Sequence, residues 1–349
     1  MLHDGELARR IRDDALTGMT SNPTIFERAL AQGTAYDAQL SAAAGDRSAW
    51  ELFELVETTD VRDACDAFAP VYEATNGVDG YVSIEVSPGA ADDAAATIDE
   101  AHRLWKTVDR PNVMIKVPGT SEGCVALRQL VADGINVNVT LLFGVAPHAQ
   151  VIEAYLSGLE DRVKARGDVS RIASVASFFV SRVDSEVDKR LEKIGTPAAN
   201  ALLGQAAVAN ARLAYALFLE RFAGARWAAL AAEGAHVQRP LWASTGTKNP
   251  AYSDVKYVET LVGPDTVNTL PPATLDAFRD HGRASRTVDA GIGAARATIA
   301  GLTGVGVDLN AVTDQLLVDG LASFQKSFDT LIAGLEAKVK SLGRTVASR

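Results

Sequence analysis

The chain has 349 residues, 47% of them hydrophobic, which is ample for a sizeable buried core. Its formal net charge of -10 argues against a nucleic-acid-binding protein, because no broad basic surface is available to neutralise phosphates. Isolated Lys or Arg residues can still bind a small phosphorylated ligand.

Short apolar runs alternate with longer amphipathic stretches along the chain. Residues 1–15 read as a helix, with Leu7, Ile11 and Leu16 on one side. Continuous apolar runs bounded by turn residues are typical of strands buried on both faces. These runs predict strands at Leu16–Ser21, Gly80–Val86, Val113–Val117, Ile135–Thr140, Ile172–Ser177, Leu241–Ser244 and Val267–Leu270.

The stretches between these runs predict helices, because their apolar residues recur at a spacing of three to four. They are Trp50–Glu73, Asp92–Val108, Glu122–Asp133, Ala146–Arg166, Arg182–Lys193, Asn200–Arg221 and Asp254–Leu261. The stretch Leu309–Leu342 predicts one or two further helices. Such alternation indicates an α/β fold of parallel strands with right-handed helical crossovers. No linker or repeat stands out, so we expect a single domain over residues 1–349, with residues 309–342 as a C-terminal helical segment.

The strand count indicates a (β/α)8 TIM barrel whose first strand is missing from this chain. Seven strands are predicted here, whereas a closed barrel of this type needs eight. Removing a strand from a closed barrel leaves two long unpaired edges. We therefore expect either that the recorded start lies downstream of the native one, or that the fold is compensated in another way.

Polar side chains sit near the ends of the predicted strands, where barrel enzymes place their active sites. Thr20, Ser21 and Asn22 end the first of these strands. Asn138 and Thr140 alternate with valines, so they face the same side of their strand. Other polar residues follow the same rule, and they are Glu85, Lys116, Ser174, Ser177 and Ser244.

Lys116 stands alone among apolar residues, and an ammonium in such a strand is costly to bury. Burial of a lysine favours the neutral amine, which attacks carbonyl carbons, and the resulting iminium is an electron sink for cleaving a neighbouring C–C bond. Glu85 is the best candidate for moving protons, and with Thr140 it can position a water. The alternative is a buried Glu85–Lys116 ion pair that only holds the barrel together, and spacing alone does not separate the two.

Weaker signals point away from other chemistries. Gly291 and Gly293 lack a preceding strand and a complete glycine pattern, which argues against a dinucleotide site. The five histidines are scattered without metal-ligand spacing, so no metal site is expected. Arg182 begins a predicted helix, and an Arg beside a helix N-terminus suits phosphate, although an ion-paired surface Arg is the commoner case. Lys248 follows another strand and is either a second phosphate ligand or a turn lysine.

The cellular setting is read from the cysteines and the N-terminus. Cys65 and Cys124 are too few for a disulfide framework and favour reduced thiols. No run of about 18 apolar residues predicts a membrane helix, and the polar N-terminus lacks the apolar core of a signal peptide. We expect a cytoplasmic protein with no membrane and no nucleic-acid partner. Nothing in the sequence predicts the oligomeric state.

Six segments together resemble the transaldolase family, in the longer bacterial form found in actinobacteria. The resemblance runs from about Gly5 to the end of the chain. Any one segment is suggestive, and the probability that all six occur in the same order by chance is very small. They are Gly18–Phe26, Val82–Val86, Asn112–Pro118, Gly134–Phe143, Ala176–Asp184 and Trp242–Pro250.

The resemblance implies a cofactor-free transferase of the non-oxidative pentose phosphate pathway. It would move a three-carbon dihydroxyacetone unit from sedoheptulose 7-phosphate or fructose 6-phosphate to an aldose phosphate, through a lysine Schiff base. A related alternative is an aldolase that releases free dihydroxyacetone. Phosphorylated sugars are then the expected partners.

The resemblance also implies roles for individual residues. Lys116 matches the Schiff-base lysine, and Glu85 and Thr140 match the pair that holds a catalytic water. The remaining matches are to substrate-binding residues: Thr20, Asn22 and Asn138 toward the three-carbon unit, Ser177 and Ser244 as further contacts, and Arg182 and Lys248 toward phosphate. The spacing around Lys248 differs from that of shorter family members, which weakens its match.

One departure from the family pattern concerns a general acid/base. The family carries an aspartate on its first strand, in a Trp-Leu-Asp-like context, and no such strand precedes Leu2. Asp13 and Asp14 lie on a predicted helix and are not candidates. A second alternative is therefore an N-terminally truncated barrel that binds phosphosugars with weak or no turnover. Extending the chain upstream should then restore activity.

Overall fold

The structure is a computed structural model that describes residues 4–22, 26–27, 30, 33–45 and 47–343. Residues 23–25 of the predicted Gly18–Phe26 motif lie outside the described residues. The chain forms two compact units. The first comprises residues 1–117, 135–137 and 321–349, and the second comprises residues 118–134 and 138–320. The single-domain organisation stays a prediction, and each unit is described by itself.

Three parallel strands form the sheet of the first unit. They are β1 (Gly18–Thr20), β2 (Tyr81–Glu85) and β3 (Val113–Pro118). Gly18 pairs with Tyr81, and Glu85 pairs with Lys116. Every residue of β2 and β3 is buried. The continuous apolar runs of the sequence thus mark strands covered on both faces, as predicted.

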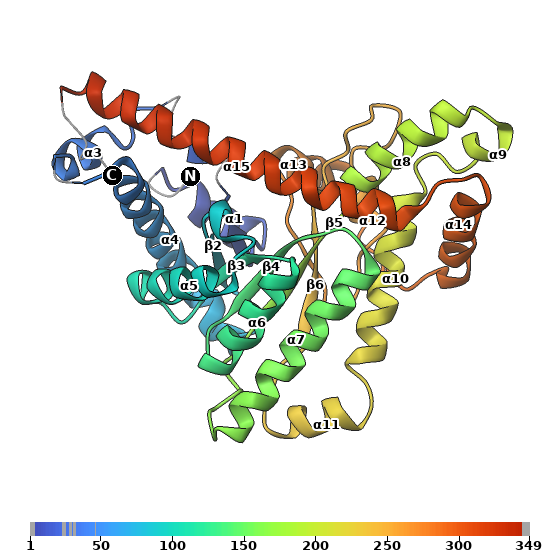
Figure 1. The fold of residues 1–349 in the computed structure, drawn as a ribbon, viewed down its shortest axis with the longest axis horizontal. Coiled ribbons are helices and arrows are strands. Elements are labelled where there is room, and N and C mark those ends of the chain that lie inside the picture. Colours follow the sequence, from blue (N-terminus) through green and yellow to red (C-terminus); the bar gives the residue numbers. More distant parts are fainter. Residues whose placement is uncertain (1–3, 23–25, 28–29, 31–32, 46, 344–349) are drawn as a thin grey trace. The chain divides into compact units, whose positions relative to one another are not determined.

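Helices cover these strands. The first unit contains α1 (Glu6–Asp13), α3 (Asp37–Ala43), α4 (Ala49–Ala74), the 3-10 turn η1 (Pro88–Ala90), α5 (Ala94–Val108) and the end of α15 (Leu309–Ser341). Figure 1 shows α4 and α5 beside β2 and β3. Phe53 of α4 and Phe328 of α15 meet edge to face in a core cluster that also contains Leu331 and Leu335. The C-terminal stretch predicted as one or two helices is one helix.

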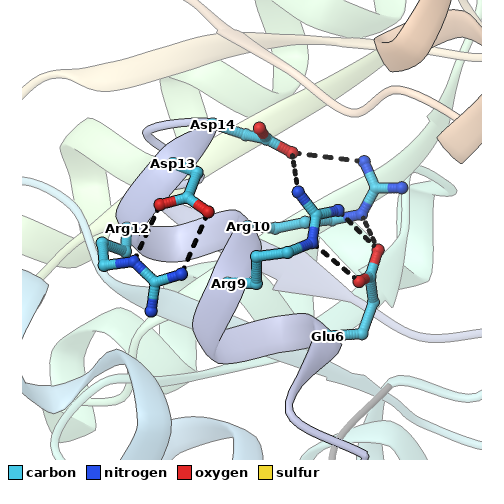
Figure 2. A network of polar contacts seen from close by, with 6 residues as sticks. All are labelled: Glu6, Arg9, Arg10, Arg12, Asp13 and Asp14. Atoms are coloured by element: carbon cyan, nitrogen blue, oxygen red, sulfur yellow. Dashed lines mark hydrogen bonds and ion pairs between the residues drawn. The ribbon is translucent and has the colours of Figure 1, made fainter.

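Helix α1 confirms that residues 1–15 contain a helix rather than a strand. Figure 2 shows the polar network along it, in which Glu6 accepts hydrogen bonds from Arg9 and Arg10. Arg10 also bonds Asp14 one turn later, at 3.4 Å. Side chains three and four residues apart are neighbours on a helix, so these pairs support α1, in which Leu7 and Arg10 are buried.

The second unit contains the next strands in chain order. They are β4 (Val137–Leu142), β5 (Ser174–Phe179), β6 (Gln238–Ala243) and β7 (Val267–Asn268). β5 and β6 run parallel, with Ser177 opposite Leu241, and β6 pairs with β7 in the same sense. Every strand predicted from the sequence is present, with ends that differ by up to three residues.

The helices of the second unit alternate with these strands. They are α6 (Ser121–Asp133), α7 (Val145–Lys164), α8 (Ser181–Ile194), α9 (Pro197–Asn200), α10 (Ala206–Arg221), α11 (Ala225–Ala232), α12 (Lys256–Glu259), α13 (Pro272–His281), α14 (Ile292–Gly304) and the start of α15. The single helix predicted over Asn200–Arg221 is wrong at its start. Gly204 has a φ of +67° and its N–H donates to Asp188, which ends one helix before α10 begins.

The fold class is α/β, of the TIM-barrel type, with extra C-terminal helices. Seven parallel strands, each neighbouring the next in chain order within its unit, lie in the described part of the chain. Within the residues that the structure describes, no helix has the length and apolar character needed to cross a membrane.

Candidate active site

Lys116 and Glu85 form a buried ion pair in the first unit. The parallel register of β2 and β3 sets the two residues side by side, and both lie near the carboxyl ends of their strands. The Lys116 Nζ lies 3.0 Å from the Glu85 Oε2, and the two residues are only 5% and 9% exposed. The buried ion pair that the sequence left as one alternative is thus present, and a catalytic role for the two residues stays a prediction.

The electrostatics of the pair depend on its burial. Burial raises the pKa of Glu85, and the neighbouring Lys116 ammonium opposes that change. The ammonium also donates toward the Ser21 carbonyl oxygen at 3.5 Å and lies 5.8 Å from the centre of the Phe324 ring. A cation over an aromatic face is weakly stabilised, because the negative face of the ring attracts it electrostatically.

The residues predicted on β1 lie at the end of the same sheet. The Thr20 hydroxyl donates to the Ser21 carbonyl oxygen at 3.3 Å, and the Ser21 hydroxyl donates to the Ser83 carbonyl oxygen. Asn22 is half-buried directly after them. The structure thus places Thr20, Ser21 and Asn22 close to Lys116 in the first unit.

A second group of predicted residues lies in the second unit. The Ser177 hydroxyl on β5 donates to the Asn138 side-chain oxygen on β4 at 2.7 Å, and both residues are buried. Thr140 follows on β4, with 0% exposure. Among the described residues, nothing forms a hydrogen bond with the Thr140 hydroxyl. Buried hydroxyls are nearly always paired, so this one is a natural site for a polar ligand atom.

Two strained backbone positions flank this group. Leu141 follows Thr140 and has a φ of 61°, and Ser244 after β6 has a φ of 55°. Residues with a side chain rarely adopt this left-handed conformation, and it is concentrated at functional sites. The Ser244 hydroxyl lies 3.0 Å from the Ser181 hydroxyl, so the turn after β6 is fixed against the start of α8.

Arg182 lies in the first turn of α8. Its guanidinium packs over the Phe179 ring at 5.2 Å, and burial lowers its pKa. No acidic side chain in the described part of the chain pairs with it. An unpaired, partly buried guanidinium beside a helix N-terminus favours an anionic ligand over the ion-paired alternative.

Lys248 is exposed and borders a different pocket of the second unit. That pocket has a volume of about 220 Å³ and also contains Asp184, Asp188 and Glu192. Lys256 bonds Asp184 there at 2.9 Å. Carboxylates repel phosphate, so the pocket itself does not suit it, and a phosphate-binding role for Lys248 stays a prediction.

The chemistry that this arrangement supports is covalent and proton-based. A buried amine beside a carboxylate forms and breaks C–N bonds while the carboxylate carries the proton. Nowhere in the described ranges do three or more His, Cys, Asp or Glu residues gather in a way that could hold a metal ion.

Sequence reasoning missed two residues. Ser181 falls inside a quoted motif, but its contact with Ser244 joins residues 63 positions apart and has no local signal. Glu57 is buried on α4 and lines one pocket with Glu85. Its signal was its position, because it interrupts the helical spacing of the buried residues Phe53 and Val61 with a carboxylate.

A buried lysine–carboxylate pair at the carboxyl ends of parallel strands lies where enzymes of the α/β barrel class place their active sites. Comparison with known proteins gives the family. The family model for transaldolase/fructose-6-phosphate aldolase matches residues 3–335. The chain therefore belongs to the transaldolase/fructose-6-phosphate aldolase family.

Individual relatives agree with this assignment over nearly the whole chain. It is 51% identical to the transaldolase of Mycolicibacterium smegmatis, with 97% of this chain and 92% of the relative covered. It is 52% identical to the transaldolase of Thermobifida fusca, with 95% and 90% covered. It is 46% identical to transaldolase 2 of a Nostoc species, with 98% and 93% covered.

Proposed function

We propose that this protein is a transaldolase, which transfers a dihydroxyacetone unit from a ketose phosphate to an aldose phosphate. The chain is identical to two transaldolases at about half of the aligned positions, over nearly its full length, and this identity supports the activity. The observation that carries the chemistry is the buried Lys116–Glu85 pair, 3.0 Å apart. We further propose sedoheptulose 7-phosphate or fructose 6-phosphate as the donor and the cytoplasm as the location.

The reaction begins with a proton transfer within the pair. Lys116 passes one ammonium proton to Glu85, and the neutral amine attacks the ketose carbonyl carbon. A C–N bond forms, the carbonyl oxygen takes up protons and leaves as water, and an iminium results. The Glu85 carboxylate then takes, through water, the proton of the hydroxyl group on the carbon that leaves. The electron pair of the adjacent C–C bond moves into the iminium, which releases an aldose and leaves an enamine.

The enamine attacks the carbonyl carbon of the acceptor aldose, and Glu85 returns the proton to the oxygen of the new hydroxyl group. Water then hydrolyses the resulting iminium, which releases the product ketose and restores the free amine of Lys116. We propose that the Thr140 hydroxyl positions the water involved in the proton transfers with Glu85. Its buried, unpartnered hydroxyl supports this role. We propose that Thr20, Asn22, Asn138, Ser177 and Ser244 hold the hydroxyls of the sugar, and that Arg182 holds its phosphate.

Borohydride trapping tests the proposal. Fructose 6-phosphate and borohydride should add a reduced three-carbon or six-carbon adduct to Lys116, located by mass spectrometry of the peptide. Lys116→Ala should abolish both trapping and transfer to erythrose 4-phosphate, a loss of at least about four orders of magnitude in rate. Lys106, an exposed-face lysine on α5, provides the control as Lys106→Ala, which should behave as the wild type. An active Lys116→Ala variant contradicts the proposal.

A further inference from the structure

Glu57 is a buried carboxyl group with no assigned role. It lies on α4 at helical spacing from Phe53 and Val61, and it is only 4% exposed. Among the described residues, none forms a hydrogen bond or a close ion pair with it. An isolated carboxylate in such a position is costly, so the neutral acid is favoured.

Glu57 shares a pocket of the first unit with Glu85. The pocket has a cavity volume of about 10 Å³, which is room for about one water, and its walls are Trp50, Phe53 and Phe328 together with the residues Val86, Ser87 and Pro88 that follow β2. Apolar walls weaken screening by water, so two carboxyl groups facing one space influence each other strongly. Because Glu85 is bonded to Lys116, a change at Glu57 acts on the proposed reacting pair.

The charged groups around Glu57 come from four elements. Glu54 lies on α4, Glu85 on β2, Glu100 on α5 and Lys116 on β3. Burial raises the pKa of Glu57 well above its ordinary value, the three carboxylates raise it further, and Lys116 lowers it. The residues that α15 contributes to the pocket are not charged. These influences together favour the neutral acid form of Glu57 beside the ion-paired carboxylate of Glu85.

We propose that Glu57 is a positioning residue for the Glu85–Lys116 pair, donating a hydrogen bond toward Glu85 through one water in the pocket they share. This inference rests on the proposed function of Lys116. The donated hydrogen bond favours the carboxylate form of Glu85, which keeps that group ready to receive a proton. Glu57 retains its own proton throughout the reaction.

The step that depends on Glu57 is the first proton transfer. One N–H bond of the Lys116 ammonium breaks and one O–H bond forms on Glu85, with no other change in charge. When water later leaves the carbon that bonds Lys116, Glu85 returns this proton. Without a donor at Glu57, Glu85 becomes protonated at a higher pH than in the wild type. At a given acidic pH, fewer protein molecules then have the Glu85 carboxylate that the first proton transfer needs.

The test is the pH profile of borohydride trapping at Lys116 in full-length variants. Glu57→Leu removes the donor while retaining most of the side-chain volume. Its acid limb should move to higher pH by about one unit, and trapping below the midpoint should slow about tenfold. Glu57→Gln has an amide that donates the same hydrogen bond, so its limb should coincide with that of the wild type. Glu54→Gln removes a carboxylate three residues away on the same helix, outside the pocket, and should leave the limb unmoved.

Equal rate losses in both Glu57 variants, with the limb unmoved, would show a purely structural role and overturn the inference. The inference is also overturned if Glu57→Leu is trapped at the wild-type rate and the acid limb of its pH profile does not move. If the wild type is not trapped at any pH, the proposed function fails, and infrared spectroscopy then tests Glu57 alone. A protonated-carboxyl band at neutral pH should be lost in Glu57→Gln and kept in Glu85→Gln. Its absence from the wild type also overturns the inference, even where a variant does not fold.

Discussion

Burial decides what the charged residues of this protein can do. Lys116 is 5% exposed and stands in a strand whose other residues are apolar or proline, so its ammonium is stable only beside a counter-charge. Glu85 provides that charge from the neighbouring strand at 3.0 Å. A pair held so closely exchanges a proton with little rearrangement, which is what amine attack on a carbonyl requires.

Arg182 gives a prediction at the scale of a single residue. Arg182→Ala should raise KM for fructose 6-phosphate by about 100-fold and change KM for unphosphorylated fructose by less than about twofold. The reason is that charge-assisted hydrogen bonds from a guanidinium to phosphate are each worth about 1.5–3 kcal/mol. Steady-state kinetics with both substrates measures the difference.

A variant on the same helix controls for general damage. Arg190 lies two turns after Arg182 on α8 and pairs with Glu186. Arg190→Ala should therefore leave both KM values unchanged. An equal loss of activity toward both substrates in Arg182→Ala would show that the guanidinium holds the structure instead.

The sequence predicts those residues of the candidate site that stand out as polar within the apolar pattern of their own strand. Lys116 and Glu85 are recognised because they interrupt apolar runs, and Asn138 and Thr140 because they alternate with valines at a period of two. Ser181 and Glu57 could not be assigned in this way. Both act through partners that are distant in the chain. Ser181 contacts Ser244, and Glu57 lines a pocket with Glu85.

At the scale of elements, helix α4 carries both Glu57 and the aromatic wall of its pocket. The helix begins with a capping box, in which Ser48 accepts from the Glu51 N–H and Glu51 accepts from the Ser48 N–H. This arrangement satisfies two backbone donors that have no partner within the helix. The start of α4 is thus fixed directly before Trp50, the first residue of the helix that lines the pocket.

Removing this cap should lower stability without touching the proposed chemistry. Ser48→Ala should reduce the free energy of unfolding by about 1 kcal/mol, as measured by urea denaturation followed by circular dichroism. Trapping at Lys116 should proceed at the wild-type rate in buffer. Ser121→Ala is the matched control, because the Ser121 hydroxyl bonds only an exposed Glu122 and Thr120 is the cap there. A Ser48→Ala variant as stable as Ser121→Ala would contradict this account of the helix start.

Element boundaries were predictable where the pattern was strong. All seven strands and the long helices, such as α4 and α7, lie where periodicity placed them. Two kinds of structural element were not predicted from the sequence. Short helices such as α11 and α13 offer only two or three turns in which a period can be recognised, and the turn at Gly204 lies inside a run of helix-favouring alanines. Its left-handed backbone is held by a hydrogen bond to Asp188, a tertiary contact that propensity does not contain.

At the scale of the whole molecule, buried titratable groups couple stability to pH in opposite directions. Glu57 has a pKa raised in the folded state, so the folded protein binds more protons than the unfolded chain above pH 4.5. Its contribution to stability therefore falls as pH rises. His148 behaves in the opposite way. It is fully buried, and burial lowers its pKa from 6.5 to about 4.

The sign for His148 follows from which state binds the proton. Between pH 6.5 and about 4 the unfolded chain takes up a proton that the folded protein refuses, so stability falls as pH falls through this window. Since one pKa unit corresponds to about 1.4 kcal/mol, the full loss is on the order of 3 kcal/mol. Within the described residues, neither ring nitrogen of His148 has a hydrogen-bond partner, which makes the group costly even when neutral.

His148→Leu should remove both costs. Leucine has a similar volume and retains the apolar contact that His148 makes with Phe178. The variant should be more stable than the wild type by about 1 kcal/mol at pH 7 and by about 3–4 kcal/mol at pH 4. Urea midpoints measured from pH 7 to pH 4 give the difference at each pH, which cancels the acid sensitivity that other carboxylates contribute to both proteins. His281→Leu provides the control, because His281 is exposed and pairs with Asp254. If the difference between His148→Leu and the wild type does not grow as the pH falls, His148 is protonated in the folded protein and the account of its burial is wrong.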